Sequence, residues 1–562
     1  MDLSVERPWL RSYAPGVPAS VTPSDESLVD LLRDAARRFG PRVALDFFGA
    51  GTTYADLADQ VGRAAEALRR LGVGRGDRVA LVLPNCPQHV VAFYAVLRLG
   101  AVVVEHNPLY TAQELARQLA DHGARVAVVW DRITPLVREA AGETAVETVV
   151  AVDLTRALPR RKRWALRLPL ARARATRAAM TGPAPGALSW ERLVAEASPL
   201  DAAHPAPGPD DTALLQYTGG TTGTPKGAIL THRNLRTNAA QGRAWVPGLR
   251  DGEETVYAVL PLFHAYGLTL CLTFSVSIGA TLVLFPRFDL DQTLDAVRRR
   301  PPTFLPAVPP IYEKLATAAR ERGVDLSSAR YAISGAMALP PATVELWESV
   351  TGGLLVEGYG MTETSPVALG NPVSPARRPG TVGVPFPSTD IRIVDPEDPS
   401  RDRAPGEAGE LLVRGPQVFA GYWNRPAETA AALLPDGWLR TGDVVVTDAD
   451  GFVSVVDRIK ELIITGGFNV YPSEVEDTLR SVPGVRDAAV VGLPGEHGEE
   501  VVAAVVADEG TQLDEADVRA ACRRHLAGYK VPCRVVVVEE LPRSQLGKVL
   551  RREVRDRLLA GG

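Results

Sequence analysis

The sequence predicts an α/β protein in which a large N-terminal part with parallel sheets is followed by a small antiparallel β unit and a compact α+β unit. From residue 28 onward, short apolar runs rich in β-branched residues alternate with helical patterns of about ten residues. Parallel strands that are buried on both faces and joined by helices have this pattern. Beyond Gly383 turn signals separate the apolar runs, and beyond Asp457 strands and helices alternate over a shorter length.

In the N-terminal part, apolar residues at helical spacing predict the helices, and β-branched runs predict the strands between them. The second helix is closed by Gly72, a residue typical of helix C-termini. The segment 267–285 has no charge and could span a bilayer, but Gly279 and the β-branched ending favour a buried helix, a turn and a strand. The first elements expected are helices at 28–37, 54–71, 88–99 and 111–122 and strands at 78–83, 101–104 and 126–130.

The two C-terminal units are predicted from their turns. Pro405-Gly406 and Asp450-Gly451 separate apolar runs, which indicates an antiparallel meander or a small barrel over about 383–457. We place a domain boundary at the end of this range, near 457–460, which gives domains at 1–457 and 458–562. The expected elements are strands at 390–394, 409–413, 444–447 and 452–456, then strand 462–464, helix 473–480, strands 488–491 and 501–507, helix 514–525 and strand 535–538.

Composition argues against several classes of protein. The 562 residues are 46% hydrophobic and 23% charged, and the four cysteines lie far apart, so neither a disulfide framework nor a zinc site is expected. A net charge of −5 argues against a nucleic-acid binder. Residues 1–20 carry charges and prolines where a signal peptide would be apolar, so we expect a cytoplasmic protein.

The segment 156–177 is strongly basic. It holds nine Lys and Arg residues and no acid, interleaved with Trp164, Leu166, Leu168 and Leu170. Two prolines limit any helix there to about two turns. Two interpretations stay open: a solvated insertion, or a patch that makes peripheral contact with anionic lipid at the inner membrane face.

The segment 214–228, LLQYTGGTTGTPKGA, has the composition of a phosphate-binding loop. Glycines let backbone N–H groups converge on phosphate oxygens, threonines add hydroxyl donors, and Lys226 adds a positive charge. Because Pro225 precedes Lys226 and Gly227 follows it, the loop is not a Walker loop. The residues expected to hold the triphosphate are Thr218, Gly219, Gly220, Thr221, Thr222 and Gly223.

The segment 356–365, VEGYGMTETS, also suits a nucleotide site. Its glycines permit close backbone approach, Tyr359 offers a flat face for a base, Thr362 offers a hydroxyl, and Glu363 offers a hard oxygen ligand for Mg²⁺.

Together, YTGGTTGTPKG and VEGYGMTETS resemble the motifs of the adenylate-forming superfamily, which includes acyl-CoA synthetases, luciferases and peptide-synthetase adenylation domains. The resemblance implies a large domain of two βα-layered sheets plus a barrel, a small mobile C-terminal domain, ATP and CoA as co-substrates, and Mg²⁺ held by Thr218 and Glu363. The motifs and the segment 334–336 imply further ATP-binding residues: Gly335, Ala336, Glu357, Gly358, Tyr359, Gly360, Met361 and Thr362.

Further motifs lie near the C-terminus: RTGD at 440–443, DRIK at 457–460, and LPRSQLGKVLRR at 541–552. The last is similar to the superfamily tail whose lysine reaches the carboxylate and the α-phosphate together. The resemblance assigns Asp443 and Arg458 to ribose, Lys460 to the interdomain hinge, Gly466, Gly467 and Phe468 to CoA, and Lys548 to adenylation.

Stretches such as VVVEHNPLYTAQEL and GFNVYPSEVE are most similar to bacterial long-chain fatty acid–CoA ligases. That likeness places His264 against the substrate carboxylate and implies an apolar tunnel for the acyl chain. Glu105-His106 stands where small polar residues are usual, and the sequence offers no functional account of it. The residues expected to line the tunnel are His264, Tyr266, Gly267, Leu305, Gly383 and Val384.

The resemblance therefore implies an ATP-dependent fatty acid–CoA ligase that works through an acyl-adenylate. Alternatives stay open: an aryl-acid (coumarate-type) or medium-chain acyl-CoA ligase, a fatty acyl-AMP ligase that serves a carrier protein, and a non-catalytic nucleotide sensor on membranes. The oligomeric state is also open, with a homodimer as one option. The residues expected to act in catalysis are Lys548, His264, Lys226 and Thr362.

Overall fold

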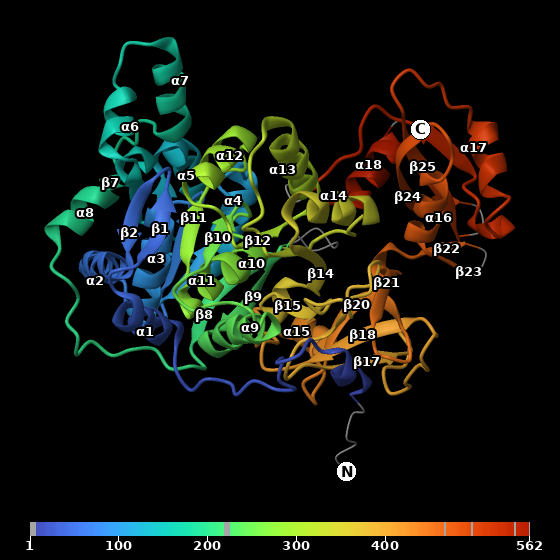
Figure 1. Cartoon of the computed structure of the whole chain (residues 1–562), viewed down its shortest axis with the longest axis horizontal. Coiled ribbons are helices and arrows are strands. Elements are labelled where there is room, and N and C mark those ends of the chain that lie inside the picture. Colours follow the sequence, from blue (N-terminus) through green and yellow to red (C-terminus); the bar gives the residue numbers. More distant parts are fainter. Residues whose placement is uncertain (1–6, 219–224, 466–467, 496–497, 545–546, 561–562) are drawn as a thin grey trace.

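The computed structural model describes residues 7–218, 225–465, 468–495, 498–544 and 547–560 (Figure 1). Two large sheets and their helices form the N-terminal part, an antiparallel sheet follows, and a smaller mixed sheet with its own helices lies at the C-terminal end. The predicted fold class is confirmed. The predicted domain boundary at 457 falls inside β21 (Val453–Arg458) and stays a prediction.

The first large sheet runs in the order β16-β15-β14-β13-β12-β10-β11-β1-β2. From β14 to β1 neighbouring strands are parallel, and antiparallel pairs close both edges. The strands are β1 (Val43–Phe47), β2 (Ala50–Thr53), β10 (Thr255–Ala258), β11 (Thr281–Leu284), β12 (Phe304–Ala307), β13 (Tyr331–Ser334), β14 (Leu354–Gly360), β15 (Val367–Gly370) and β16 (Val384–Pro385).

The second large sheet runs in the order β19-β9-β8-β4-β3-β5-β6-β7 and is parallel from β8 to β7. Its antiparallel edge, made by β8, β9 and β19, carries the predicted phosphate loop. The strands are β3 (Arg78–Val82), β4 (Val102–Glu105), β5 (Val126–Trp130), β6 (Thr148–Val152), β7 (Leu188–Ser189), β8 (Thr212–Thr218), β9 (Lys226–Thr231) and β19 (Gly421–Tyr422).

Helix α3 (Pro87–Arg98) is buried along nearly its whole length, and the turn before it joins the two large sheets. The Asn85 carboxamide donates to the carbonyls of Ala258 and Leu260, at 3.0 and 2.8 Å, and accepts the Leu262 N–H. The other helices around these sheets are α1 (Leu28–Phe39), α2 (Tyr54–Arg70), α4 (Ala112–His122), α5 (Thr134–Ala141), α8 (Trp190–Glu196), α9 (His232–Trp245), α12 (Leu290–Arg299), α13 (Pro309–Arg322), α14 (Pro341–Thr351) and α15 (Pro426–Ala432).

The uncharged segment 267–285 folds as predicted into helix, turn and strand. The chain passes through α10 (Ala265–Gly267), η4 (Leu268–Thr273) and α11 (Phe274–Ile278), turns at Gly279 with a left-handed φ of 67°, and continues as β11. Its apolar side chains belong to the main core. In the ranges that the structure describes, no helix combines the length and the apolar character needed to cross a bilayer.

The antiparallel sheet has the order β17-β18-β20-β21, which is the predicted meander. A bridge between Gly383 and Val453 links it to the edge of the first large sheet. Its strands are β17 (Asp390–Val394), β18 (Gly409–Arg414), β20 (Leu439–Thr447) and β21.

The C-terminal unit, residues 463–560, has the sheet order β23-β22-β25-β24, with β26 on β25. It has its own apolar core on both faces of the sheet. Its elements are β22 (Ile463–Thr465), β23 (Phe468–Val470), α16 (Pro472–Arg480), β24 (Val485–Gly495), β25 (Gly498–Ala507), α17 (Glu515–Cys522), β26 (Arg534–Val537) and α18 (Arg551–Ala560).

The structure gives Glu105 and His106 a place in the core. Glu105 Oε1 lies 2.9 Å from His89 Nε2, and both side chains are fully buried. His106 contacts Gln118 Oε1 at 2.8 Å through Nδ1 and His122 Nε2 at 3.1 Å through Nε2. Burial lowers the pKa of His106 to about 4, so the His106 ring is neutral at pH 7.

Candidate functional site

The phosphate loop connects β8 to β9, and the structure describes both ends of it. Thr218 is the last residue of β8 and pairs with Lys226, the first residue of β9. The Thr218 hydroxyl lies 3.5 Å from the Lys226 carbonyl. The glycines and threonines expected between them, Gly219, Gly220, Thr221, Thr222 and Gly223, lie outside the described residues.

Tyr422 joins this hairpin to Glu363, the predicted magnesium ligand. In β19 it pairs with Ala228 of β9, and its hydroxyl donates to Glu363 Oε1 at 2.6 Å. The Lys226 ammonium lies 5.3 Å from the centre of the Tyr422 ring. Burial raises the pKa of Glu363, and the Tyr422 hydrogen bond opposes that rise. The predicted residues Lys226 and Glu363 are thus held by one side chain that the sequence analysis did not identify.

Tyr359, Asp443 and Arg458 form a second predicted group that the fold brings together. The Tyr359 hydroxyl donates to Asp443 Oδ2 at 2.5 Å, and the Arg458 Nε lies 2.8 Å from Asp443 Oδ1. Strands β20 and β21 place Asp443 directly opposite Arg458. A carboxylate held this way keeps acceptor capacity for the two hydroxyls of a ribose.

Residues on both sides of Tyr359 also stabilise the local fold. The Glu357 carboxylate accepts from Asn371 Nδ2 at 2.9 Å and from the Gly380 N–H at 3.2 Å, so its side chain supports a neighbouring loop. At Gly360 a Cβ atom would lie 1.8 Å from the Pro366 carbonyl oxygen, and at Gly358 it would lie 3.2 Å from Ile333. Met361 and Thr362 follow, and Thr362 begins the 3₁₀ turn η5 (Thr362–Thr364) that contains Glu363.

The segment 334–337 links the two predicted halves of the site. At Gly335 a Cβ atom would lie 3.1 Å from the Tyr266 ring, and Ala336 has a left-handed φ of 69°. On the other side, a Cβ atom at Gly547 would lie 3.4 Å from Met337 Sδ. The tail that carries Lys548 therefore lies against the segment expected to contact adenine.

Lys548 lies near the second group. Burial and the Arg458 charge lower the pKa of Lys548, while the carboxylates of Glu461 and Asp443 oppose this. The tail is held by hydrogen bonds from the Ser544 N–H to the Lys548 carbonyl, at 2.8 Å, and from the Lys548 N–H to the Ser544 hydroxyl, at 3.2 Å. A single lysine is thus brought close to the predicted ribose residues.

His264 is accessible to solvent, yet the surrounding protein lowers its pKa to about 4. The Tyr266 N–H donates to His264 Nδ1 at 3.3 Å, so the proton of the neutral ring is on Nε2. His264 can therefore donate one hydrogen bond from Nε2 at pH 7.

The other predicted acyl-pocket residues belong to the first large sheet or pack on it. The Tyr266 hydroxyl donates to the Ile333 carbonyl at 2.6 Å, and a side chain at Gly267 would collide with the Pro261 carbonyl. Leu305 in β12 and Val384 in β16 are fully buried, with three strands between them in the sheet order. Their place in an acyl pocket stays a prediction.

The CoA and hinge predictions remain predictions. Gly466 and Gly467 lie outside the described residues, and Phe468 begins β23. Lys460 lies in the 3₁₀ turn η6 (Ile459–Glu461), between β21 and β22. Within the described ranges, no three His, Cys, Asp or Glu side chains gather as a metal-binding group, so the magnesium prediction depends on Glu363 with Thr218.

Sequence reasoning missed two residues of this region, Tyr422 and Arg551. Tyr422 lies 59 positions from its partner Glu363, and Arg551 lies 75 from Glu476. Neither has a local spacing that signals its contact, because each contact joins elements far apart in the sequence that only the fold brings together.

Comparisons with known proteins agree with this geometry. The family model described as "AMP-binding enzyme" matches residues 32–423, and the model of the AMP-binding enzyme C-terminal domain matches residues 474–548. A long-chain-fatty-acid–CoA ligase of Bacillus subtilis (strain 168) is 38% identical over 556 residues, 98% of each chain.

The likeness extends to other members. The 4-coumarate–CoA ligase 3 of Oryza sativa subsp. japonica is 35% identical over 528 residues, which cover 91% of this chain and 88% of that protein. A crystal structure of ATP-bound MatB from Rhodopseudomonas palustris superposes with a TM-score of 0.82 at 31% identity, covering 95% of this chain and 99% of MatB. The chain is an acid–thiol ligase, and it belongs to the family of AMP-binding enzymes.

Proposed function

We propose that this protein is an ATP-dependent long-chain fatty acid–CoA ligase that acts through an acyl-adenylate. The observation that carries the proposal is the place of Lys548. Its tail packs on Met337, and its pKa responds to Arg458 and Asp443, so one cation lies where the predicted adenine and ribose residues meet. A cation at that point neutralises charge on a carboxylate and an α-phosphate as they join.

In the first step, a carboxylate oxygen of the acid attacks the α-phosphorus of ATP, and the bond to the β-phosphate oxygen breaks. Acyl-adenylate and pyrophosphate form, and no side chain acts as the nucleophile. Neutral His264 donates from Nε2 to the carboxylate, and Lys548 and Lys226 balance the phosphate charge. The buried Glu363 carboxylate and the Thr218 hydroxyl are hard oxygen donors that suit Mg²⁺, which would neutralise further phosphate charge.

In the second step, the CoA thiol attacks the acyl carbon, AMP leaves with the bonding electrons, and the thiol loses its proton. We assign this step to a second pose, in which the C-terminal unit has turned about Lys460 and presents the segment 466–468. Rotation about one hinge is an ordinary way for an enzyme to use two catalytic faces.

The fatty acid is chosen because the Bacillus subtilis relative is named a long-chain-fatty-acid–CoA ligase and matches over nearly its whole length. The rice relative supports the alternative, an aryl acid.

A pyrophosphate-release assay over linear C2 to C18 acids and aryl acids, with and without CoA, tests the proposal. We expect the highest rate with acids of C12 to C18 and acyl-CoA formation when CoA is present. A maximum below C6 or on an aryl acid would replace the substrate assignment. Adenylate formation without thioester formation would indicate the carrier-protein alternative.

We also propose that the basic segment 156–177 makes peripheral contact with anionic membranes. Its helices α6 (Arg160–Ala165) and α7 (Ala171–Met180) have no buried residue and project from the molecule beyond the second large sheet (Figure 1). Trp164, Leu168 and Leu170 are 67%, 49% and 59% exposed beside arginines. Apolar side chains among cations suit a bilayer surface better than a nucleic acid, which offers no apolar layer.

A further inference from the structure

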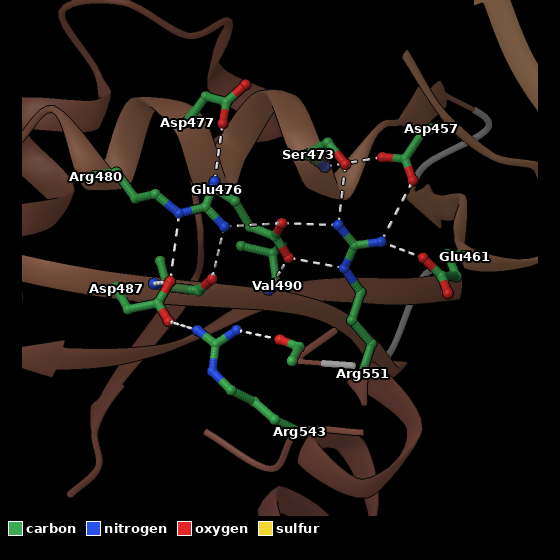
Figure 2. A network of polar contacts seen from close by, with 12 residues as sticks. Asp457, Glu461, Ser473, Glu476, Asp477, Arg480, Asp487, Val490, Arg543 and Arg551 are labelled. Atoms are coloured by element: carbon green, nitrogen blue, oxygen red, sulfur yellow. Dashed lines mark hydrogen bonds and ion pairs between the residues drawn. The ribbon is translucent and has the colours of Figure 1, made fainter. Parts of the chain in front are cut away.

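We infer that Arg551 is a positioning residue of the adenylation step, because it joins the two sides of the expected hinge and so holds Lys548 over the site. The inference rests on the proposed two-step function. Figure 2 shows Arg551 at the centre of a network of carboxylates.

Arg551 is first bound to helix α16 of its own C-terminal unit. Its Nε donates to Glu476 Oε1 at 2.8 Å, and its Nη2 donates to Glu476 Oε2 at 2.7 Å and to the Ser473 hydroxyl at 2.9 Å (Figure 2). This two-pronged pairing fixes the plane of the guanidinium. These contacts move with the C-terminal unit and do not depend on its orientation.

The remaining nitrogen of Arg551 reaches across the hinge. Nη1 pairs with Glu461 and lies 3.5 Å from Asp457 Oδ1. Asp457 belongs to β21 of the antiparallel sheet, and Glu461 follows Lys460. Arg551 therefore contacts the chain on both sides of Lys460.

Asp457 makes a second contact across the same boundary. Its Oδ2 accepts the Ser473 N–H at 2.8 Å, at the start of α16. The side chain is only 3% exposed, so it needs these partners. Because a rotation about Lys460 moves α16 relative to β21, both contacts of Asp457 hold in the pose described here and break in another.

The same pose brings Lys548 to the site. Lys548 lies three residues before Arg551, and the Leu550 N–H donates to the Pro542 carbonyl at 2.9 Å, which keeps the two in one anchored segment. In this orientation of the C-terminal unit, Gly547 packs on Met337. The contacts of Arg551 and Asp457 thus favour the pose in which Lys548 is close to Asp443, and they do not contribute to thioester formation.

The test compares the half-reactions in Arg551→Met and in a matched control, Arg480→Met. Arg480 lies in the same network and contacts the same Glu476 at 3.5 Å, but its partners Asp477 and Asp487 all belong to the C-terminal unit (Figure 2). Adenylation is measured as pyrophosphate formed from ATP and hexadecanoic acid without CoA. Thioester formation is measured from supplied hexadecanoyl-adenylate and CoA.

We expect Arg551→Met to slow adenylation about 10²-fold, the typical cost of misplacing a catalytic group, and to leave thioester formation within about threefold. Arg551→Lys should recover part of the adenylation rate, and Arg480→Met should change the two half-reactions equally. If Arg551→Met slows both half-reactions alike, or neither, the inference is wrong.

A folding failure of Arg551→Met and a failure of the proposed function can be distinguished from a failure of the inference. If Arg551→Met does not fold, Asp457→Asn is the second variant, because it removes the negative charge that faces Arg551 across the hinge and keeps the pairing of Arg551 with Glu476. It should slow adenylation about 10-fold and spare thioester formation, and an equal effect on both overturns the inference. If the wild-type protein forms no pyrophosphate with this acid or any other, the proposed function has failed rather than the role of Arg551.

Discussion

At the scale of single residues, the site depends on groups whose charge state is set by burial. Burial favours the neutral form of both Lys548 and Glu363, because it lowers the pKa of the lysine and raises the pKa of the glutamate. The carboxylates near Lys548 and the Tyr422 hydrogen bond to Glu363 oppose these shifts. His264 is neutral at pH 7 and has one free donor. Glu363 and Lys548 have partners from distant parts of the chain, whereas His264 is held by the nearby Tyr266 N–H.

The pH dependence of adenylation should report Lys548. The pKa of Lys548 lies below its ordinary value of 10.5. As the pH rises, Lys548 should therefore lose its proton before pH 10.5 is reached, and the rate should decline with the protonated form. Lys548→Ala should lower the rate ~10²–10³-fold. Lys548→Arg, which keeps its proton, should abolish the alkaline decline at a reduced maximum rate. An alkaline limb that persists unchanged in Lys548→Arg would assign it to another group. The measurement is pyrophosphate release between pH 6 and 10.

Tyr422→Phe should raise the Mg²⁺ concentration needed for half-maximal pyrophosphate release about 10-fold. The change removes the hydroxyl that donates to Glu363 Oε1 and keeps the ring that faces Lys226, and the loss of a partner that orients a metal ligand typically costs 10–100-fold in affinity. Tyr13→Phe is the control, since its hydroxyl donates to the Pro385 carbonyl and touches none of these groups. An unchanged Mg²⁺ requirement would exclude the orienting role.

At the scale of elements, local signals predicted helices and strands that the structure contains. Helices α1, α2, α4 and α9 begin at capping boxes, and the structure places α1, α2 and α4 within two residues of the predicted ranges. The largest shift is at β20, which begins at Leu439 rather than at 444. The polar residues RTGD join the strand because Leu439 and Arg440 pair with β18. Pairing with the neighbouring strand β18 therefore determined where β20 begins, which the composition of the segment could not predict.

The turn before β16 offers a matched pair of glycines. Gly380 and Gly383 have φ values of 84° and 85°, but a Cβ atom at Gly380 meets no heavy atom within 4 Å, whereas at Gly383 it would lie 2.0 Å from the Gly370 carbonyl carbon. Gly380→Ala should therefore cost about 1 kcal/mol for the left-handed backbone alone. Gly383→Ala should cost more, about 3 kcal/mol, because backbone atoms must also move apart.

Thermal unfolding of the two glycine variants is the measurement. The midpoint should fall further for Gly383→Ala than for Gly380→Ala. Equal midpoints would mean that the predicted contact with Gly370 does not exist.

At the scale of the whole molecule, the exposed helices α6 and α7 predict binding to vesicles. The wild-type protein should sediment with vesicles that contain phosphatidylglycerol, and less so as salt rises. Replacing Arg161, Arg163 and Arg167 by Gln should weaken binding about 10²-fold, at about 1 kcal/mol per cation. Trp164→Ser should also weaken it, because the indole is exposed.

Leu109→Ser is the matched control, since Leu109 is 70% exposed but lies outside 156–177 and should not affect vesicle binding. Vesicle binding that does not change with salt concentration would contradict the proposal. So would binding to pure phosphatidylcholine vesicles as strong as binding to vesicles that contain phosphatidylglycerol. Equal binding to duplex DNA would show that the segment recognises phosphate charge without a bilayer.

The sequence alone determined the α/β class, and its motifs selected the phosphate loop and the residues Tyr359, Glu363, Asp443 and Lys548 as candidates whose roles stay predictions, because composition, periodicity and contiguous motifs are local properties of a chain. The tertiary structure decided which of these residues meet. Tyr422 reaches Glu363, and Arg551 reaches Asp457, only because strands and helices far apart in the sequence share an edge or a boundary in space. The structure also revealed that Glu105 contacts the buried His89, which no local pattern indicated, since a buried polar group needs a hydrogen-bond partner that the fold supplies.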